Sequence, residues 1–202
     1  MSIRLILISA ALAAVALGWY QLFLFSSTPG EQFAAPASWP QDIPALSATL
    51  PSGGHTPLLL VFVHPRCSCT PATLEQFDQL LDSTPTPVHV ALVVYRSKAV
   101  SQQPPGAEHA PLLRVHAQAR IQVLPDTNGL LARRFGAATS GEIVLYSANG
   151  HLLFQGGITP MRSQTGNSAG ADALRNALAT GAIQAKAASV FGCKIFLPGH
   201  AG

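Results

Sequence analysis

The hydrophobic positions of this chain form one long continuous block at the N-terminus and several short blocks further along. The long block runs from Leu5 to Phe25 without a charged residue. A helix rises about 1.5 Å per residue, so a block of this length crosses the hydrocarbon core of a bilayer, which is about 30 Å thick. No polar face interrupts it, as one would in a helix packed on a soluble core. The pattern predicts a transmembrane helix within residues 1–25, with residues 5–25 in the membrane.

The residues at the two ends of this block suggest its orientation. Arg4 is the only charged residue before it, and Trp19 and Tyr20 stand near its far end. Positive charge favours the cytoplasmic side and aromatic rings favour the interface. We therefore expect a single-pass protein of the inner (cytoplasmic) membrane whose remaining chain faces the periplasm. A cleaved signal peptide is the alternative, but its best small-residue site, at residues 35–37, lies well downstream and contains a proline.

Residues 26–57 are rich in Pro, Ser, Ala and Gly and show no sustained period, which is typical of a linker. The short hydrophobic blocks begin after it. Residues 58–63 and 88–95 are continuous apolar runs of strand length, typical of strands covered on both faces. Between them, residues 70–82 carry apolar side chains at helical spacing. This order predicts a right-handed parallel β-α-β unit.

The second half of the chain contains a strong hairpin signal. Asn149-Gly150 lies between apolar runs at residues 143–148 and 151–155, as in an antiparallel pair joined by a two-residue turn. The other predicted elements are helices at residues 107–119, 127–135 and 169–179, the last capped by Asn167 or Ser168, and a short strand at residues 121–124. We therefore predict an α/β domain over residues 58–180, a mixed sheet flanked by helices, and a C-terminal extension over residues 181–202.

Composition adds little to this picture. The chain is 48% hydrophobic and only 10% charged, with a net charge of +3. The basic residues are scattered, and the longest run is Arg133-Arg134. No basic patch is predicted, so we do not expect nucleic acid as a partner.

The candidate chemistry lies in Cys67-Ser68-Cys69, where the first predicted strand ends and a helix begins. The unpaired N–H groups and the positive dipole end of a helix N-terminus stabilise a thiolate. Arg66, and His64 with it, would lower the thiol pKa further. A thiolate is the species that attacks a disulfide, which makes Cys67 and Cys69 candidate catalytic residues.

An aromatic residue, Phe62, precedes Cys67 by five positions, and residues 141–156 form a strand, a turn and a strand that ends in glycine. On these features the chain resembles the thioredoxin-like superfamily, in particular the membrane-anchored TlpA, ResA and RedB types. Asp126 and Phe135-Gly136 fit the connecting helix of that family. The resemblance implies a thioredoxin-like fold and a thiol–disulfide oxidoreductase that needs no cofactor. Its partners would be protein thiols or disulfides in the periplasm.

Two positions depart from the family pattern. Cys67 matches the nucleophilic cysteine, but the family's resolving position holds Thr70, so Cys69 is expected to resolve. A Cys-x-Cys disulfide closes a small, strained ring and should be easy to reduce. The family's cis-proline falls on Gly141, which affects the loop where substrates dock beside the thiols.

The third cysteine, Cys193, follows the last element of the resemblance. An odd cysteine count leaves one thiol over, and Cys193 either resolves Cys67 or Cys69 or stands in a tail by itself. A purely structural disulfide is a further alternative, although adjacent cysteines would constrain little chain.

Other functions of the same residues stay open. Cys67, Cys69 and His64 offer two thiolates and an imidazole, a set that suits Cu(I), so copper is the alternative cofactor. A non-catalytic binding or assembly module of the same fold is also compatible with the sequence. A peroxidase of the peroxiredoxin kind needs a threonine three residues before the cysteine, and His64 occupies that position.

Overall fold

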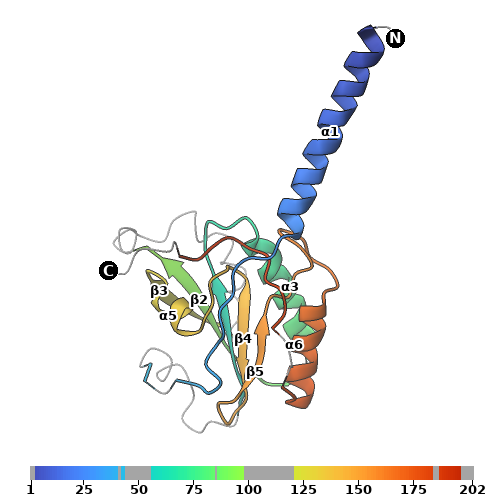
Figure 1. The fold of residues 1–202 in the computed structure, drawn as a ribbon. Helices are drawn as coiled ribbons and strands as arrows, with labels where there is room; N and C mark the ends of the chain where they lie inside the picture. The colour runs from blue at the N-terminus through green and yellow to red at the C-terminus, as the bar shows by residue number, and fades with distance from the viewer. Residues whose placement is uncertain are drawn as a thin grey trace.

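The computed structural model describes residues 3–40, 42–43, 56–84, 86–97, 121–183 and 187–196. A mixed five-stranded sheet forms its centre, in the order β3-β2-β1-β4-β5 (Figure 1). β1, β2 and β3 are parallel, whereas β4 is antiparallel to both β1 and β5. The elements in chain order are α1 (Ile3–Ser27), β1 (Leu58–Val63), α3 (Thr70–Asp82), β2 (His89–Arg96), β3 (Ile121–Thr127), α5 (Leu130–Arg134), β4 (Glu142–Tyr146), β5 (Leu152–Gly156) and α6 (Ala169–Thr180).

The continuous apolar strands are buried on both faces because each face has its own cover. Leu59, Val61 and Val63 of β1 pack in one hydrophobic cluster with the apolar sides of α3 and α6. Leu58, Leu60 and Phe62 point to the opposite face and pack with residues near α5 and with parts of the N- and C-terminal segments. This is the thioredoxin-like fold, and it confirms the predicted mixed sheet with flanking helices.

Most predicted elements are found with small shifts in their ends. The predicted hairpin is present, but its turn is longer than the two residues expected: the Gly150 N–H donates to Ser147 O (2.9 Å) and the Ser147 N–H to His151 O (2.8 Å). Gly150 takes the positive φ, 79°, that this turn requires. Ser168 is the residue that caps α6, through a bond from the Ala171 N–H to its side chain. The helix predicted at residues 107–119 lies outside the described residues.

The region between β3 and α5 differs from the prediction. β3 continues through Pro125 to Thr127, which is tolerated because β3 is an edge strand. The helix predicted over residues 127–135 is consequently shorter and begins only at Leu130. The buried Asp126 carboxylate accepts hydrogen bonds from the N–H groups of Leu131 (2.8 Å) and Ala132 (3.0 Å), so it caps α5 from the strand before it.

The segment after α1 was expected to be a linker, but its described part, up to residue 43, packs on the domain. The Trp39 N–H donates to Gly150 O (2.8 Å), and the Tyr146 hydroxyl donates to Pro36 O (2.9 Å). The Trp39 ring also lies against Phe135 and Tyr146, with centroid distances of 5.7 and 5.5 Å. These contacts follow no periodic pattern, so hydrophobic periodicity does not predict them. As a result α1 projects directly from the folded domain (Figure 1).

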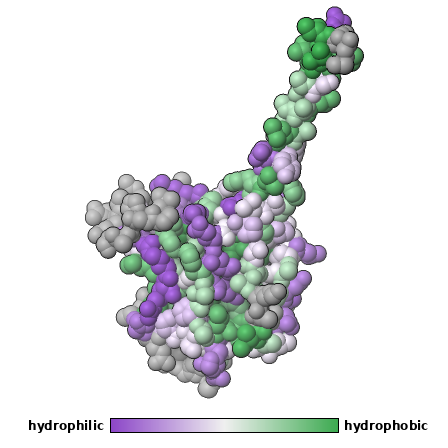
Figure 2. Space-filling view, viewed as in Figure 1, coloured by the Kyte–Doolittle hydropathy of each residue, from purple (hydrophilic) through white to green (hydrophobic). Residues whose placement is uncertain are grey.

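α1 is the long N-terminal helix, and none of its residues is buried. Figure 2 shows its surface as largely apolar, in contrast to the mixed surface of the domain. By length and composition this helix can cross a membrane, with a mean hydropathy of 1.9 over its most apolar window. A signal sequence near an N-terminus satisfies the same criteria.

Candidate thiol site

The turn between β1 and α3 holds Cys67 and Cys69. The Cys67 N–H donates to His64 O (3.0 Å), and the Thr70 N–H donates to Cys67 O (3.0 Å). Cys69 is the N-cap residue of α3, and Pro71 stands in the first turn, where its missing N–H has no cost. Both cysteines are buried, each 3% exposed. The two thiols therefore lie at a helix N-terminus, as the sequence predicted.

Thr70 stands where the resemblance places the second cysteine, and its side chain has a structural role. Its hydroxyl donates to His64 O (2.9 Å) and lies 3.1 Å from the hydroxyl of Ser140. The Ser140 hydroxyl in turn accepts the His64 N–H (2.9 Å). This network joins the turn before α3 to the loop that leads into β4.

Gly141 follows Ser140 in that loop and adopts a φ of +95°. Its N–H donates to Phe62 O (2.8 Å). A proline has φ fixed near −65° and no N–H, so it fits neither feature. A proline, which the resemblance places at position 141, would therefore not fit this backbone, and no peptide bond among the described residues is cis.

Cys193 lies beside the other two cysteines. Its backbone N–H donates to the Sγ atom of Cys67 at 3.2 Å. The Sγ atoms of Cys67, Cys69 and Cys193 all lie within 4.8 Å of one another, and the three thiols are free. The fold thus collects all three cysteines of the chain into one cluster, which we call the thiol cluster.

Backbone hydrogen bonds hold Cys193 in this place. The Ser140 N–H donates to Cys193 O (2.8 Å), and the Ile195 N–H donates to Ala138 O (2.8 Å). Thr139 and Lys194 form an antiparallel bridge between these two bonds. The C-terminal segment 192–195 therefore runs antiparallel to residues 138–140, directly beside the thiols.

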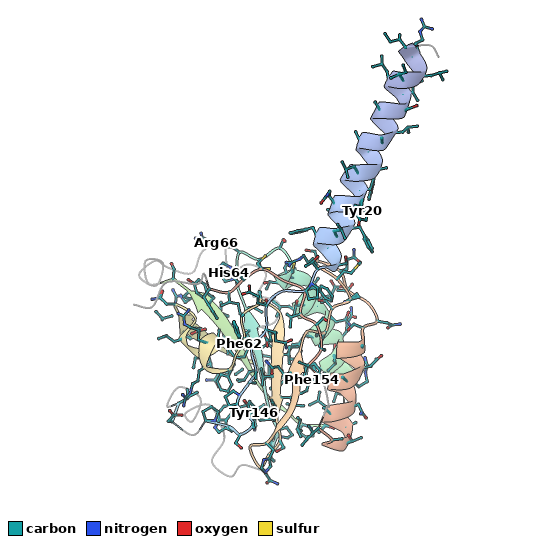
Figure 3. All side chains as sticks on the ribbon, in the orientation of Figure 1. Tyr20, Phe62, His64, Arg66, Tyr146 and Phe154 are labelled. Atoms are coloured by element: carbon teal, nitrogen blue, oxygen red, sulfur yellow. The ribbon has the colours of Figure 1, made fainter. Side chains whose placement is uncertain are left out.

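Arg162 links this segment to the base of α1. Its guanidinium donates to Gly192 O, to Phe25 O (3.0 Å) and to Thr28 O (3.3 Å). The same group lies over the Phe25 ring, 4.9 Å from its centroid. The thiol cluster therefore lies at the end of the domain from which α1 emerges, where Figure 3 also shows the labelled His64 and Arg66.

The thiols of Cys67 and Cys193 have shifted pKa values in opposite directions. Burial acts to raise the pKa of Cys67, but hydrogen bonds from the thiol and N–H of Cys193 and of Cys69 outweigh it, so the pKa of Cys67 is lowered. The pKa of Cys193 is raised to about 12, first by burial and then by its hydrogen bond to Cys67 and the negative charge there. Of these two thiols, Cys67 is therefore the more readily ionised.

His64 and Arg66 lie near the thiol cluster, but the contacts described for the His64 side chain are with residues other than the three cysteines. The His64 ring stacks on Tyr95 with a centroid distance of 4.9 Å, and its Nδ1 atom accepts the Arg66 N–H (3.2 Å). Arg66 is exposed. The hydrogen bonds that lower the pKa of Cys67 come from its cysteine neighbours.

Sequence reasoning missed two residues of the connection between β5 and α6. These are Arg162, described above, and Ser163. The Ser163 hydroxyl lies 3.2 Å from Ser68 O and 3.5 Å from Cys69 Sγ, and the residue adopts a φ of +56°. The sequence shows only a long Gly-containing turn at this point. A non-glycine residue with positive φ is unusual, and here it places a hydroxyl against the thiol cluster.

Comparison with known proteins supports the fold alone. No family model matches the chain, and no curated protein matches it. Among solved structures, the chain is similar to an uncharacterized conserved protein from Geobacillus kaustophilus, with a TM-score of 0.55 and 17% identity over 87% of this chain and 96% of that chain. A hypothetical protein from Sinorhizobium meliloti 1021 has a TM-score of 0.51 and 20% identity over 86% and 96%. A secreted Mycobacterium tuberculosis disulfide oxidoreductase homologous to E. coli DsbE has a TM-score of 0.41 and 18% identity over 62% and 81%.

Proposed function

We propose that this chain is a thiol–disulfide oxidoreductase in which Cys67 is the nucleophile. The observation that carries the proposal is the setting of the Cys67 sulfur, at the N-terminus of α3 and within hydrogen-bond reach of the Cys193 N–H at 3.2 Å. The hydrogen bonds around this sulfur lower the pKa of Cys67, which increases the thiolate fraction at neutral pH. A thiolate held beside other free thiols is suited to thiol exchange.

The proposed reaction begins with attack of the Cys67 thiolate on one sulfur of a partner protein's disulfide. A mixed disulfide forms, and the partner's other sulfur leaves as a thiol. A second thiol of the cluster then attacks Cys67 Sγ and releases the partner in reduced form. In the sequence-based hypothesis this second thiol is Cys69. Run in reverse, the oxidised protein accepts two electrons from a dithiol.

The test uses the full chain in detergent micelles and a protein disulfide such as insulin as substrate. Cys67→Ser should abolish exchange, because a hydroxyl does not ionise at neutral pH. Ser68→Ala is the matched control, since Ser68 is exposed and the change keeps all three thiols. Exchange at the wild-type rate in Cys67→Ser would sink the proposal.

We further propose that the protein is of the membrane-anchored TlpA, ResA or RedB kind, with α1 in the inner membrane and the domain in the periplasm. The length and apolar surface of α1 and the single Arg4 before it support this arrangement. Alkaline phosphatase fused after the domain should be active in a bacterial host, and the fusion should resist carbonate extraction. Release into the soluble periplasmic fraction with a new N-terminus would instead indicate a cleaved signal peptide.

A second candidate function is Cu(I) binding, favoured by the mutual distance of at most 4.8 Å among the three sulfur atoms. Thiolates are soft ligands that suit Cu(I). The reduced chain should then take up one equivalent of Cu(I) against a competing chelator, and Cys193→Ser should weaken uptake. His64→Ala tests the ligand set suggested by sequence. Loss of binding in this variant alone would favour Cys67, Cys69 and His64 over the thiol cluster.

A further inference from the structure

Cys69 is poorly placed to form a disulfide with Cys67 despite the closeness of the two sulfur atoms. The backbone between them is fixed by the bond from the Thr70 N–H to Cys67 O (3.0 Å). Cys69 has helical φ and ψ of −83° and −18°, and its carbonyl already accepts the Thr73 N–H (3.1 Å). A bond between Cys67 and Cys69 would close a ring across Ser68 alone, which is small and strained. A Cys67–Cys69 disulfide would have to distort the start of α3.

Cys193 approaches Cys67 from a separate segment, so a bond between them needs no change within α3. The segment lies against residues 138–140 through the two backbone bonds at Ser140 and Ala138, each 2.8 Å. Gly192 permits this close approach, because a Cβ atom there would lie 1.9 Å from Ser140 O. The Cys193 N–H already contacts Cys67 Sγ.

We infer that Cys193 is the resolving thiol of the reaction, and that the oxidised protein carries a Cys67–Cys193 disulfide. This inference rests on the proposed function and replaces Cys69 in the role that the sequence suggested for it. The C-terminal segment 192–195 then supplies one of the two thiols that react.

The electrons balance in two exchange steps. In the first, the Cys67 thiolate forms an S–S bond with one sulfur of a substrate disulfide, and the other substrate sulfur leaves and takes up a proton. In the second, Cys193 loses its proton and attacks Cys67 Sγ, the mixed disulfide breaks, and the second substrate sulfur leaves as a thiol. The two protein thiols are oxidised to one disulfide and the substrate disulfide is reduced to two thiols.

The charges of the cluster put the two steps in order. While Cys67 is a thiolate, Cys193 stays protonated. Burial is the largest cause of its raised pKa, and the hydrogen bond to Cys67 and the negative charge of Cys67 raise this pKa further. Once the Cys67 sulfur is part of a mixed disulfide, it no longer carries that charge. Arg162 then remains as the positive group that favours ionisation of Cys193. Loss of the Cys67 charge thus makes the resolving thiol easier to ionise after the first step than before it.

The same segment also limits access to the nucleophile. Cys67 is 3% exposed, and the backbone N–H of Ser140 and O of Ala138 beside it are bonded to Cys193 and Ile195. Residues 192–195 must therefore move aside for a protein substrate and return to resolve the mixed disulfide.

The experiment is a single turnover of the full, reduced chain in detergent with oxidised glutathione, followed by acid quenching and mass mapping of disulfides. The expected product in wild type and in Cys69→Ser is a Cys67–Cys193 bond. Cys193→Ser should accumulate glutathione on Cys67. Gly192→Ala keeps all three thiols but displaces the segment, and should close the bond at least about tenfold more slowly.

A Cys67–Cys69 bond in wild type, together with accumulation of glutathionylated Cys67 in Cys69→Ser and not in Cys193→Ser, would overturn the inference and leave the proposed function standing. Failure of wild type to form either a mixed or an internal disulfide would overturn both. Because the wild-type map requires no substitution, the result does not depend on whether a variant folds.

Discussion

The backbone N–H of Cys193 lies 3.2 Å from the sulfur of Cys67, although the two residues are 126 positions apart. The donor belongs to the main chain, so it persists whatever side chain stands at position 193. The Cys193 thiol is a separate donor to the same sulfur. Substitution of Cys193 can therefore separate the effect of the thiol from that of the backbone N–H on the pKa of Cys67.

Cys193→Ala should raise the pKa of Cys67, because it removes the thiol donor and keeps the backbone donor. The measurement is the pH dependence of Cys67 alkylation by iodoacetamide, followed on the Cys67 peptide by mass spectrometry. Its midpoint should move to higher pH. Lys194→Ala is the control, since the Lys194 side chain pairs with Glu31 (3.0 Å). An unchanged midpoint in Cys193→Ala would show that the thiol contributes nothing to the lowered pKa.

Arg162→Gln should open the thiol cluster to solvent. The substitution removes the guanidinium that joins Gly192 O to the carbonyls at the base of α1. We expect a bulky thiol reagent to label Cys67 and Cys193 roughly tenfold faster. A tenfold change corresponds to a loss of about 1.4 kcal/mol from the free energy that holds residues 192–195 in place. Arg175→Gln is the matched control, because Arg175 is an exposed arginine paired with Asp172 (2.7 Å). Equal labelling rates in the two variants would contradict this role for Arg162.

The elements of the sheet could be predicted from the sequence because their signals are local. The buried strand β1 and the helix α3 follow from hydrophobic spacing, and the hairpin follows from Asn149-Gly150. The packing of residues 28–40 could not be predicted. It depends on backbone hydrogen bonds and on single side chains such as Trp39 and Tyr146, which leave no periodic trace.

In the thiol site, too, the features with local sequence signals could be predicted and those that depend on tertiary packing could not. Cys67 and Cys69 could be placed at a helix N-terminus because the strand and helix on either side were recognisable. Cys193 offered only an odd cysteine count. Its position depends on the antiparallel pairing with residues 138–140 and on the absence of a side chain at Gly192, both of which are tertiary features.

Gly141→Ala should destabilise the domain by about 2 to 4 kcal/mol. Its φ of +95° strains any residue with a Cβ atom, and that atom would lie 2.8 Å from the Thr73 hydroxyl. Gly181→Ala is a matched control with a φ of +67° and nothing within 4 Å of the added Cβ, so it should cost only about 1 kcal/mol. Urea unfolding of the full chain in detergent measures both.

The contact with Thr73 can be tested separately. Adding Thr73→Ala to Gly141→Ala removes the hydroxyl and should recover part of the lost stability. Equal costs for the two glycine substitutions would mean that backbone strain alone keeps glycine at position 141.

Glu142→Gln should change how the stability of the protein depends on pH. The Glu142 side chain is fully buried, and its carboxyl accepts a hydrogen bond from the Gln155 amide (2.8 Å). Burial raises its pKa from 4.5 to about 8. Between these pH values the folded protein holds a proton that the unfolded chain has released, so stability falls as pH rises. The contribution is fully present below pH 4.5 and is lost by about pH 8.

The expected slope from this one group is about 1.4 kcal/mol per pH unit within that window. Glutamine has the same shape and cannot ionise, and its amide oxygen can accept the same bond from Gln155. The variant should therefore gain stability relative to wild type as pH rises from 5 to 8, when urea unfolding is followed at intervals of one unit. Parallel stability profiles would contradict the raised pKa. A difference that grows toward pH 8 would show that Glu142 is buried in its protonated form directly beside the loop that holds Ser140 and Gly141.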